Sequence, residues 1–253
     1  MKVLAPVAAM LGLLAAPTAA SAFDLDFGVR GWWPMNEGRG QTIYDWSGKG
    51  NHGTLGSTPG ADANDPKWIK GVFFGSGLNF GGDDFVSIRD SNALEPQKFS
   101  ISMWVRAPQS PGQFKYLLAK GSNACTSGSY GIWTASSGGI EFYVWNNTGS
   151  LVRAVGTANG IWDGRWHNVT ATYDGSRPEL FLDGKSLGEF VGSPPPIQYD
   201  QQPDGVTTIG GYRGSCDLLF TGDIDQVMMF DRVLPVELIW QRFGFILNKP
   251  TYQ

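Results

Sequence analysis

The stretch Phe99–Arg106, FSISMWVR, decides the fold of this chain. Apolar side chains at positions 99, 101, 103 and 105 alternate with Ser100, Ser102 and Arg106, and Trp104 is the one large apolar residue on the polar side. A period of two residues indicates a β-strand, because successive side chains of a strand point to opposite faces. The stretch therefore predicts a strand with one buried face.

Short apolar runs of the same character recur along the chain, and nearly every one ends at Gly, Asp, Asn, Ser or Pro. Asp183-Gly184 joins two such runs and favours the tight type I′ turn of a hairpin. Helical periodicity occurs once, over Pro235–Phe243. These patterns predict an all-β sandwich of one domain with one short C-terminal helix. The further predicted strands are Lys70–Phe74, Phe85–Ile88, Tyr116–Lys120, Tyr130–Thr134, Ile140–Trp145, Leu151–Gly156, Trp166–Tyr173, Glu179–Leu182, Val206–Ile209 and Ile224–Phe230.

The composition excludes several classes of protein. Glycine accounts for 35 of the 253 residues without a regular period, which excludes collagen, and together with the many aromatic residues it argues against a coiled coil. The 10 Trp, 8 Tyr and 15 Phe supply enough apolar surface to exclude a disordered chain. The net charge of −4 argues against nucleic-acid binding, which needs a basic surface to contact phosphates.

The first 22 residues have the pattern of a secretory signal peptide. Lys2 precedes an apolar run from Val3 to Ala16, and residues 20–22 have the small-x-small pattern of a cleavage site. A transmembrane anchor is the alternative, but the run is short and Pro17 follows it. We expect residues 1–22 to be removed and residues 23–253 to form a single domain. It would be secreted or extracytoplasmic, in the periplasm or outside the cell, with no membrane insertion after signal cleavage.

Two cysteines, Cys125 and Cys216, are the only ones in the chain. An exported protein meets an oxidising environment, so we expect them to form one disulfide bond that joins two loops. Two buried free thiols are the alternative. Zinc binding is not expected, because a structural zinc site takes four ligands.

Four motifs occur in a characteristic order. They are residues 31–38 (GWWPMNEG) with 45–53 (DWSGKGNHG), then Phe99–Arg106, then 166–175 (WHNVTATYDG) with the LFLDG strand, and finally 222–227 (GDIDQV). In this order they resemble the laminin G-like, concanavalin A-like jelly-roll domains over about residues 28–243. The resemblance implies a two-sheet antiparallel jelly-roll sandwich, often calcium-binding, that recognises glycans or extracellular proteins. Gln226 and the two methionines after it depart from the charged residues often found there, which weakens a metal role for the last motif.

Four carboxylates are candidate Ca²⁺ ligands. Ca²⁺ takes six to eight oxygen ligands, and the first and last strands of jelly rolls commonly run side by side. Glu37 and Asp45 could then meet Asp223 and Asp225, which would share one strand face. The alternative is that Asp45 forms a local Asx-type turn and that Asp225 organises a hydrogen-bond network.

Two predicted loop tips combine aromatic rings with amide and charged groups, as carbohydrate recognition requires. Residues 145–149 place Trp145 beside Asn146 and Asn147, and residues 211–216 place Tyr212 beside Arg213, near Trp133. The alternative is that the tryptophans belong to the core. Asn146 and Asn168 also begin N-x-T sequons, although a strand position such as 168 is a poor acceptor of a glycan.

The catalytic motifs of common enzyme classes are absent or misplaced. Residues 184–188 match G-x-S-x-G, but they lie in a predicted hairpin rather than at the strand-to-helix turn that a nucleophilic serine needs. Residues 223–226 resemble a paired-carboxylate run without its glutamates. We therefore expect a non-catalytic recognition module that binds carbohydrate, with possible help from calcium. The alternatives are a polysaccharide-cleaving hydrolase or lyase, and an adhesion or structural protein that binds another extracellular protein.

Overall fold

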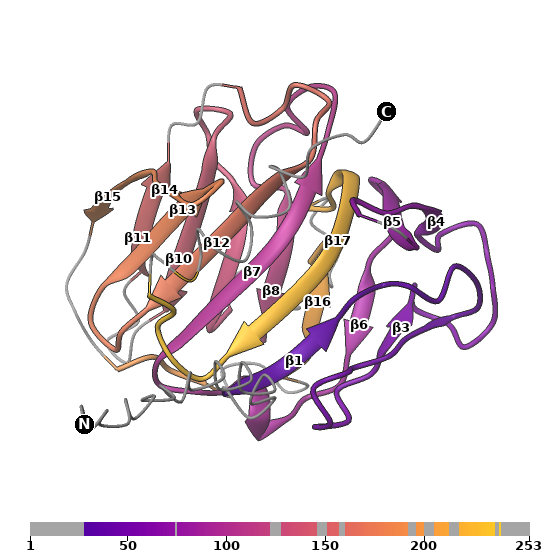
Figure 1. The fold of residues 1–253 in the computed structure, drawn as a ribbon, viewed down its shortest axis with the longest axis horizontal. Helices are drawn as coiled ribbons and strands as arrows, with labels where there is room; N and C mark the ends of the chain where they lie inside the picture. The colour runs from indigo at the N-terminus through magenta and orange to yellow at the C-terminus, as the bar shows by residue number, and fades with distance from the viewer. Residues whose placement is uncertain are drawn as a thin grey trace, which may run out of the picture.

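The structure is a computed structural model that describes residues 28–73, 75–121, 128–145, 151–156, 160–191, 196–199, 205–212, 218–235 and 238, with the backbone alone at 151–156 and 188–191. Over these residues the chain forms two antiparallel sheets that stack face to face (Figure 1). The predicted all-β sandwich is confirmed. The predicted helix at Pro235–Phe243 lies largely outside the described residues.

The first sheet has eight strands and carries Phe99–Arg106 at its centre. The first strand of the fold, β1 (Val29–Trp33), runs beside the last, β17, as expected of a jelly roll (Figure 1). The other strands lie in the order β14 (Lys185–Ser186), β13 (Pro178–Leu182), β12 (His167–Tyr173), β7 (Phe99–Arg106), β17 (Thr221–Phe230), β5 (Ser76–Gly81) and β4 (Lys67–Lys70).

The second sheet has nine strands and ends at the short edge strand β2. A single 3₁₀ turn, η1 (Asn92–Leu94), connects it to β7. The strands lie in the order β15 (Gly188–Val191), β11 (Leu151–Gly156), β10 (Ile140–Trp145), β9 (Tyr130–Thr134), β8 (Tyr116–Lys120), β16 (Thr207–Ile209), β6 (Val86–Ile88), β3 (Gly53–Leu55) and β2 (Thr42–Ile43).

The two sheets share one hydrophobic core. The alternating residues Phe99, Ile101, Met103 and Val105 are all 0% exposed within it, as the sequence predicts. The opposite face of β7 is also buried, however, which corrects the prediction of one buried face. There the hydroxyl of Ser100 donates to the carbonyl of residue 232 and accepts from the N–H of residue 234, so the segment after β17 covers this face.

Most predicted strands are present, and their observed ends lie within three residues of the predicted ones. The Asp183-Gly184 turn is confirmed, because both residues have positive φ angles (49° and 78°) and β13 pairs with β14 across them. The prediction for Lys70–Phe74 is wrong. β4 ends at Lys70, and the N–H of Gly71 donates to the carbonyl of Gly75, so the chain turns there between β4 and β5.

The register of the second sheet places short hydroxyl side chains in one row near its β2 edge. Thr42 pairs with Thr54, Thr54 with Ser87, and Ser87 with Thr208. Their neighbours Ile43, Leu55, Val86 and Ile88 are buried in the core. Because side chains alternate between faces, the hydroxyl row faces away from the core.

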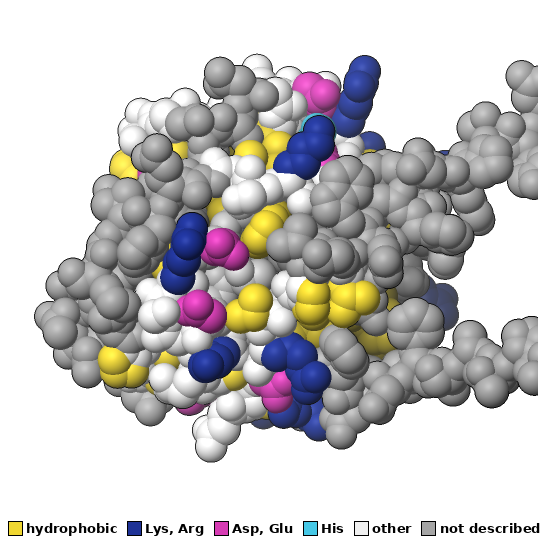
Figure 2. Space-filling model, turned by 60° about the vertical axis from the view of Figure 1, so that its left-hand side comes forward, with side chains coloured by type: hydrophobic (Ala, Val, Ile, Leu, Met, Phe, Trp, Pro, Cys, Tyr) yellow, Lys and Arg dark blue, Asp and Glu magenta, His cyan; other side chains and the backbone are white. Residues whose placement is uncertain are grey.

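The described surface mixes both signs of charge. On the face that Figure 2 shows, acidic and basic side chains are interspersed, and its described residues form no broad basic surface. None of the helices in the described part of the chain is long and apolar enough to cross a membrane.

Candidate functional site

One buried carboxylate, Asp45, shapes the segment between β1 and β3. Its Oδ1 accepts hydrogen bonds from the backbone N–H groups of Trp32 (3.0 Å) and Ser47 (2.8 Å), and its Oδ2 accepts from that of Asn51 (2.9 Å). The N–H of Asp45 donates to His52 Nδ1 (3.0 Å). The structure therefore supports the Asx-type turn for this residue.

This turn leaves the two aromatic neighbours of Asp45 in solvent. Tyr44 is 52% exposed and Trp46 is 57% exposed, whereas large apolar side chains are normally buried. Each ring has an edge contact that holds it in place, Tyr44 with His52 (centroids 5.4 Å apart) and Trp46 with Trp32 (5.6 Å). The segment therefore presents two ordered, exposed aromatic rings.

Three adjoining hollows of about 450 to 510 Å³ each follow the β2 edge, and we call them the β2 hollows. Such volumes fall within the usual range for small-molecule sites, about 300 to 1,000 Å³. The acidic hollow is lined by residues that include Gln41, Asp62, Asp65, Lys67 and Trp68. The middle hollow is lined by Glu37, Arg39, Gly40, Gln41, Thr42 and Tyr44. The basic hollow is lined by residues that include Lys49, His52, Thr54, Arg89 and Asp90.

Hydrogen-bond acceptors without protein partners lie in these walls. Glu37 Oε2, Gln41 Oε1 and Asp65 Oδ1 are buried and accept no hydrogen bond from the described residues. The other oxygen of Glu37 accepts from the N–H of Tyr44 (3.0 Å), which fixes the carboxylate beside that ring. Buried polar atoms are normally paired, so three unpaired oxygens behind these adjoining walls set the β2 hollows apart from ordinary protein interior.

The predicted aromatic tip is a packed cluster. The structure brings Trp133 and Tyr212 together through Tyr116, whose ring centroid lies 5.2 Å from the first and 5.1 Å from the second. Tyr212 is 1% exposed, so the expectation that it stands at an exposed tip is wrong: it packs on Tyr116 and Tyr143. Burial raises the pKa of both Tyr116 and Tyr143.

The two predicted tryptophans occupy intermediate positions. Trp133 is half-buried, and its Nε1–H donates to Glu141 Oε2 (2.9 Å). Trp145 is half-buried at the end of β10. Asn146, Asn147 and Arg213 lie outside the described residues, as do Cys125 and Cys216, so their binding roles and the disulfide stay predictions.

The four proposed Ca²⁺ ligands do not meet in one site. Both oxygens of Asp45 accept backbone hydrogen bonds within its turn. Those of Asp223 accept hydrogen bonds from the side chains of Asn79 (2.7 Å) and Arg106 (2.7 Å). Asp225 is fully buried and accepts from the backbone N–H groups of residues 72 and 226. Only Glu37 has an oxygen to spare. Within the described ranges, no group of three or more His, Cys, Asp or Glu side chains could hold a metal ion.

Two buried carboxyl groups have raised pKa values. Burial raises the pKa of Asp225 to about 7 and that of Asp84 to about 6, although backbone N–H donors oppose the shift. A glycosidase needs a carboxylic acid whose pKa is raised, paired with a second carboxylate on the other side of the scissile bond. Neither residue lines a β2 hollow, so these two carboxyls do not give the hollows a general acid.

Two other sequence features have structural roles. Lys185–Ser186 of the G-x-S-x-G match forms β14 of the hairpin, so the rejected serine-hydrolase motif is indeed a strand. Asn168 is 1% exposed and its side-chain amide donates to Ser102 and to the carbonyl of Met103, which leaves it inaccessible to glycosylation in the folded protein.

The sequence carries a family signature over most of this sandwich. Residues 80–239, more than half of the chain, match the model of the Concanavalin A-like lectin/glucanases superfamily. The chain belongs to this superfamily. The resemblance drawn from its four ordered motifs is confirmed. A comparison with curated protein sequences finds no match.

Solved structures with the superfamily fold are similar to this chain at low sequence identity. The binding domain of Paraclostridial Mosquitocidal Protein 1 has a TM-score of 0.67 and 12% identity over 88% of this chain and 53% of its own. Domain 4 of AbnA, an extracellular arabinanase from Geobacillus stearothermophilus solved with arabinotriose, has a TM-score of 0.64 and 14% identity over 85% and 98%. The botulinum neurotoxin DC binding domain solved with SialylT has a TM-score of 0.64 and 16% identity over 87% and 51%. This chain thus spans about half of the toxin domains and nearly all of the arabinanase domain.

Sequence reasoning missed most of the β2 hollows in this superfamily member. Tyr44 and Trp46 flank a residue that was considered only as a metal ligand or a turn former. Two aromatic residues beside a turn-forming Asp, in a segment rich in Gly, are a signal that could have found them, because the turn forces its flanking side chains outward.

Proposed function

We propose that this chain is a secreted, non-catalytic carbohydrate-binding domain whose site is the β2 hollows. The observation that carries the proposal is the exposed ring of Tyr44 in a hollow that the polar side chains of Glu37 and Gln41 also line. A sugar ring has an apolar C–H face that packs on an aromatic ring, and hydroxyl groups on its rim that donate hydrogen bonds. The lining matches both parts of such a ligand.

The superfamily neighbours support the same function. Two of them are toxin binding domains, and the botulinum neurotoxin DC domain was solved with SialylT and, in another structure, with rat synaptotagmin II. The arabinanase domain was solved with arabinotriose. At these identities the likeness establishes the fold alone. A glycan is favoured over a protein ligand here because three concave hollows, rather than a flat apolar face, lie beside the exposed rings.

The test is binding of the secreted chain to an immobilised panel of plant, bacterial and animal glycans, with reducing-sugar release measured on every glycan that binds. The proposal predicts saturable binding to at least one glycan and no release of reducing ends. Release of reducing ends at a rate proportional to the protein concentration would establish the hydrolase or lyase alternative. Binding to no glycan would overturn the proposal and favour a protein ligand.

Export is part of the proposal and rests on the leader pattern of residues 1–22. Expression of the full chain in a secreting host should yield a mature protein that begins at residue 23. Recovery of the uncleaved chain in the membrane fraction would instead support the anchor.

A further inference from the structure

The basic hollow differs in charge from its two neighbours. Lys49 and Arg89 both line it, both are exposed, and neither forms an ion pair with a described residue. Thr42 and Thr54 add hydroxyl groups from the row on β2 and β3. His52 accepts a hydrogen bond at Nδ1 from the backbone, so in its neutral form the proton is on Nε2, where it can be donated.

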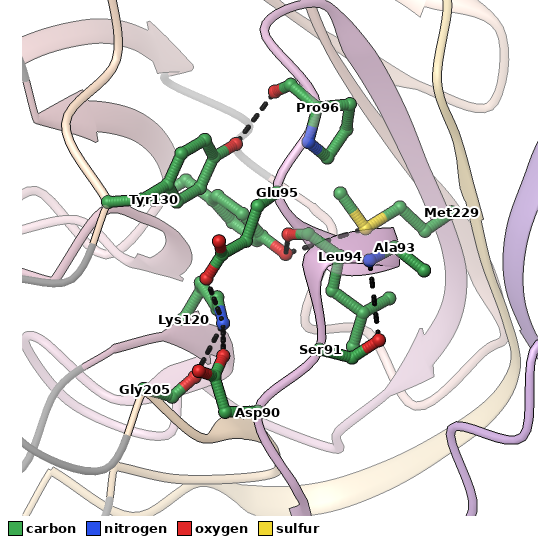
Figure 3. Close-up of polar contacts among 11 residues, drawn as sticks. Asp90, Ser91, Ala93, Leu94, Glu95, Pro96, Lys120, Tyr130, Gly205 and Met229 are labelled. Atoms are coloured by element: carbon green, nitrogen blue, oxygen red, sulfur yellow. Dashed lines mark hydrogen bonds and ion pairs between the residues drawn. The ribbon is translucent and has the colours of Figure 1, made fainter.

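The one carboxylate in this lining, Asp90, forms an ion pair with Lys120, a buried residue that does not line the hollow. Lys120 is 1% exposed, and its ammonium group contacts Asp90, Glu95 Oε1 (2.8 Å) and the carbonyl of Gly205 (2.6 Å). Figure 3 shows the two carboxylates and the carbonyl converging on this nitrogen. A buried ammonium needs such partners, so Asp90 is committed to Lys120 rather than to Lys49 or Arg89.

The local charge balance is therefore positive. Among the residues that line the hollow, Lys49 and Arg89 are cations and Asp90 is the one carboxylate, which pairs with Lys120, in a chain whose net charge is −4. The guanidinium of Arg89 can bind two oxygens of a carboxylate or a sulfate through two parallel hydrogen bonds, and Lys49 supplies a second cation at the same hollow.

We propose that the basic hollow binds an anionic group, a carboxylate or a sulfate, carried by the sugar chain whose next unit lies against Tyr44. This inference rests on the proposed function and names the ligand class as acidic glycans. The middle and basic hollows share Thr42 in their linings, so one oligosaccharide can occupy both. The exposed ring of Tyr44 then packs on a sugar unit at one end, and cations meet the anionic group at the other.

The test uses two polymer pairs that differ only in charge, polygalacturonate with its carboxyl-reduced form and dextran sulfate with dextran. Dissociation constants are measured for the wild type, for Lys49→Gln/Arg89→Gln, and for Arg177→Gln/Lys185→Gln. The second double variant removes one Arg and one Lys from the exposed β13–β14 edge, which Figure 1 places on the opposite side of the molecule from β3. All four residues are exposed, so both double variants should have the melting temperature of the wild type.

We expect at least one anionic polymer to bind about tenfold more tightly than its neutral partner, a difference of roughly 1.4 kcal/mol. Lys49→Gln/Arg89→Gln should remove that preference, and Arg177→Gln/Lys185→Gln should keep it. The pair that shows the preference identifies the carboxylate or the sulfate. An unchanged preference in the first variant, or no preference in a wild type that binds glycans of the wider panel, would overturn this inference alone. A wild type that binds no glycan would overturn both proposals.

Discussion

At the scale of single residues, Asp45 organises the candidate site. The sequence left it as either a metal ligand or a turn former, because a carboxylate suits both roles. Its three backbone hydrogen bonds show that it fixes the turn. The exposed rings of Tyr44 and Trp46 flank that turn, so Asp45 positions the Tyr44 ring that we propose contacts the glycan.

Asp45→Ala should lower the free energy of unfolding by about 3 kcal/mol, because it leaves backbone N–H groups without an acceptor in a buried place. The free energy of unfolding of Asp45→Asn should lie between those of Asp45→Ala and the wild type, since the asparagine keeps one acceptor oxygen. Denaturant unfolding measures the change. Asp83→Ala, which removes an exposed carboxylate, is the control and should unfold with the wild type. Equal stability of all four proteins would contradict the role of Asp45.

His167 predicts a pH dependence of stability. A hydrogen bond that the imidazole donates to Asp183 raises the pKa of His167 above the usual value, burial opposes this, and a second hydrogen bond donated to Asp163 adds to the rise. A raised folded-state pKa gives stability that is complete below the unfolded pKa of ~6.5 and is lost as the pH rises through the folded pKa.

The wild type should therefore exceed His167→Gln in free energy of unfolding by more at about pH 5.5 than at about pH 8.5. Denaturant unfolding at both pH values gives the two differences. A difference that grows with pH would show that the imidazole is held neutral in the fold.

At the scale of elements, alternation and turn chemistry made most strands predictable. β8, β9, β10 and β11 begin and end where the sequence predicts, because each is a run of apolar or aromatic residues that ends at a polar residue or glycine. The short strands β2 and β3 could not be predicted, since two or three residues carry no period. The composition of residues 70–74 predicts a strand, but a hydrogen bond between Gly71 and Gly75 closes a turn there.

The hairpin at Asp183-Gly184 gives an element-scale prediction. Gly184 has φ of 78°, a region that costs a residue with a Cβ about 1 to 2 kcal/mol. Gly184→Ala should lower the free energy of unfolding by about that amount. Gly60→Ala is the matched control, because an added Cβ there meets nothing within 4 Å and its φ is not in the positive range. Equal unfolding of the two variants would show that the turn is not type I′ in solution.

Two of the four candidate Ca²⁺ ligands lie on β17. Asp223 and Asp225 on this strand, like Asp45, already accept hydrogen bonds at both carboxylate oxygens. We expect EDTA to leave the melting temperature of protein that has been incubated with Ca²⁺ unchanged. A ligand that binds only the folded state at a hundredfold excess over its Kd adds about 2.7 kcal/mol, so a lost Ca²⁺ would be plainly visible. A clear fall would restore the calcium hypothesis.

At the scale of the whole molecule, the fold was predictable and the site was not. The fold follows from patterns local in sequence, repeated along the chain, and from four ordered motifs. The β2 hollows combine residues from 37–55, 61–68 and 89–91, which only the sheet order brings together. The predicted aromatic site failed at Tyr212 for the opposite reason, because the same sheet order stacks that ring on Tyr116 and buries it.

The central claim is that glycans bind at the β2 hollows and not at the Trp133 cluster. The most direct test is the dissociation constant of a glycan that binds in the panel, measured for the wild type, Tyr44→Ala and Trp133→Ala. Tyr44 is 52% exposed, so its variant should stay folded. We predict that Tyr44→Ala weakens binding about tenfold, roughly 1.4 kcal/mol, and that Trp133→Ala, checked to be folded by its melt, binds as the wild type does. Weakened binding in folded Trp133→Ala with unchanged binding in Tyr44→Ala would contradict the account and place the site on the outer face of β8–β10.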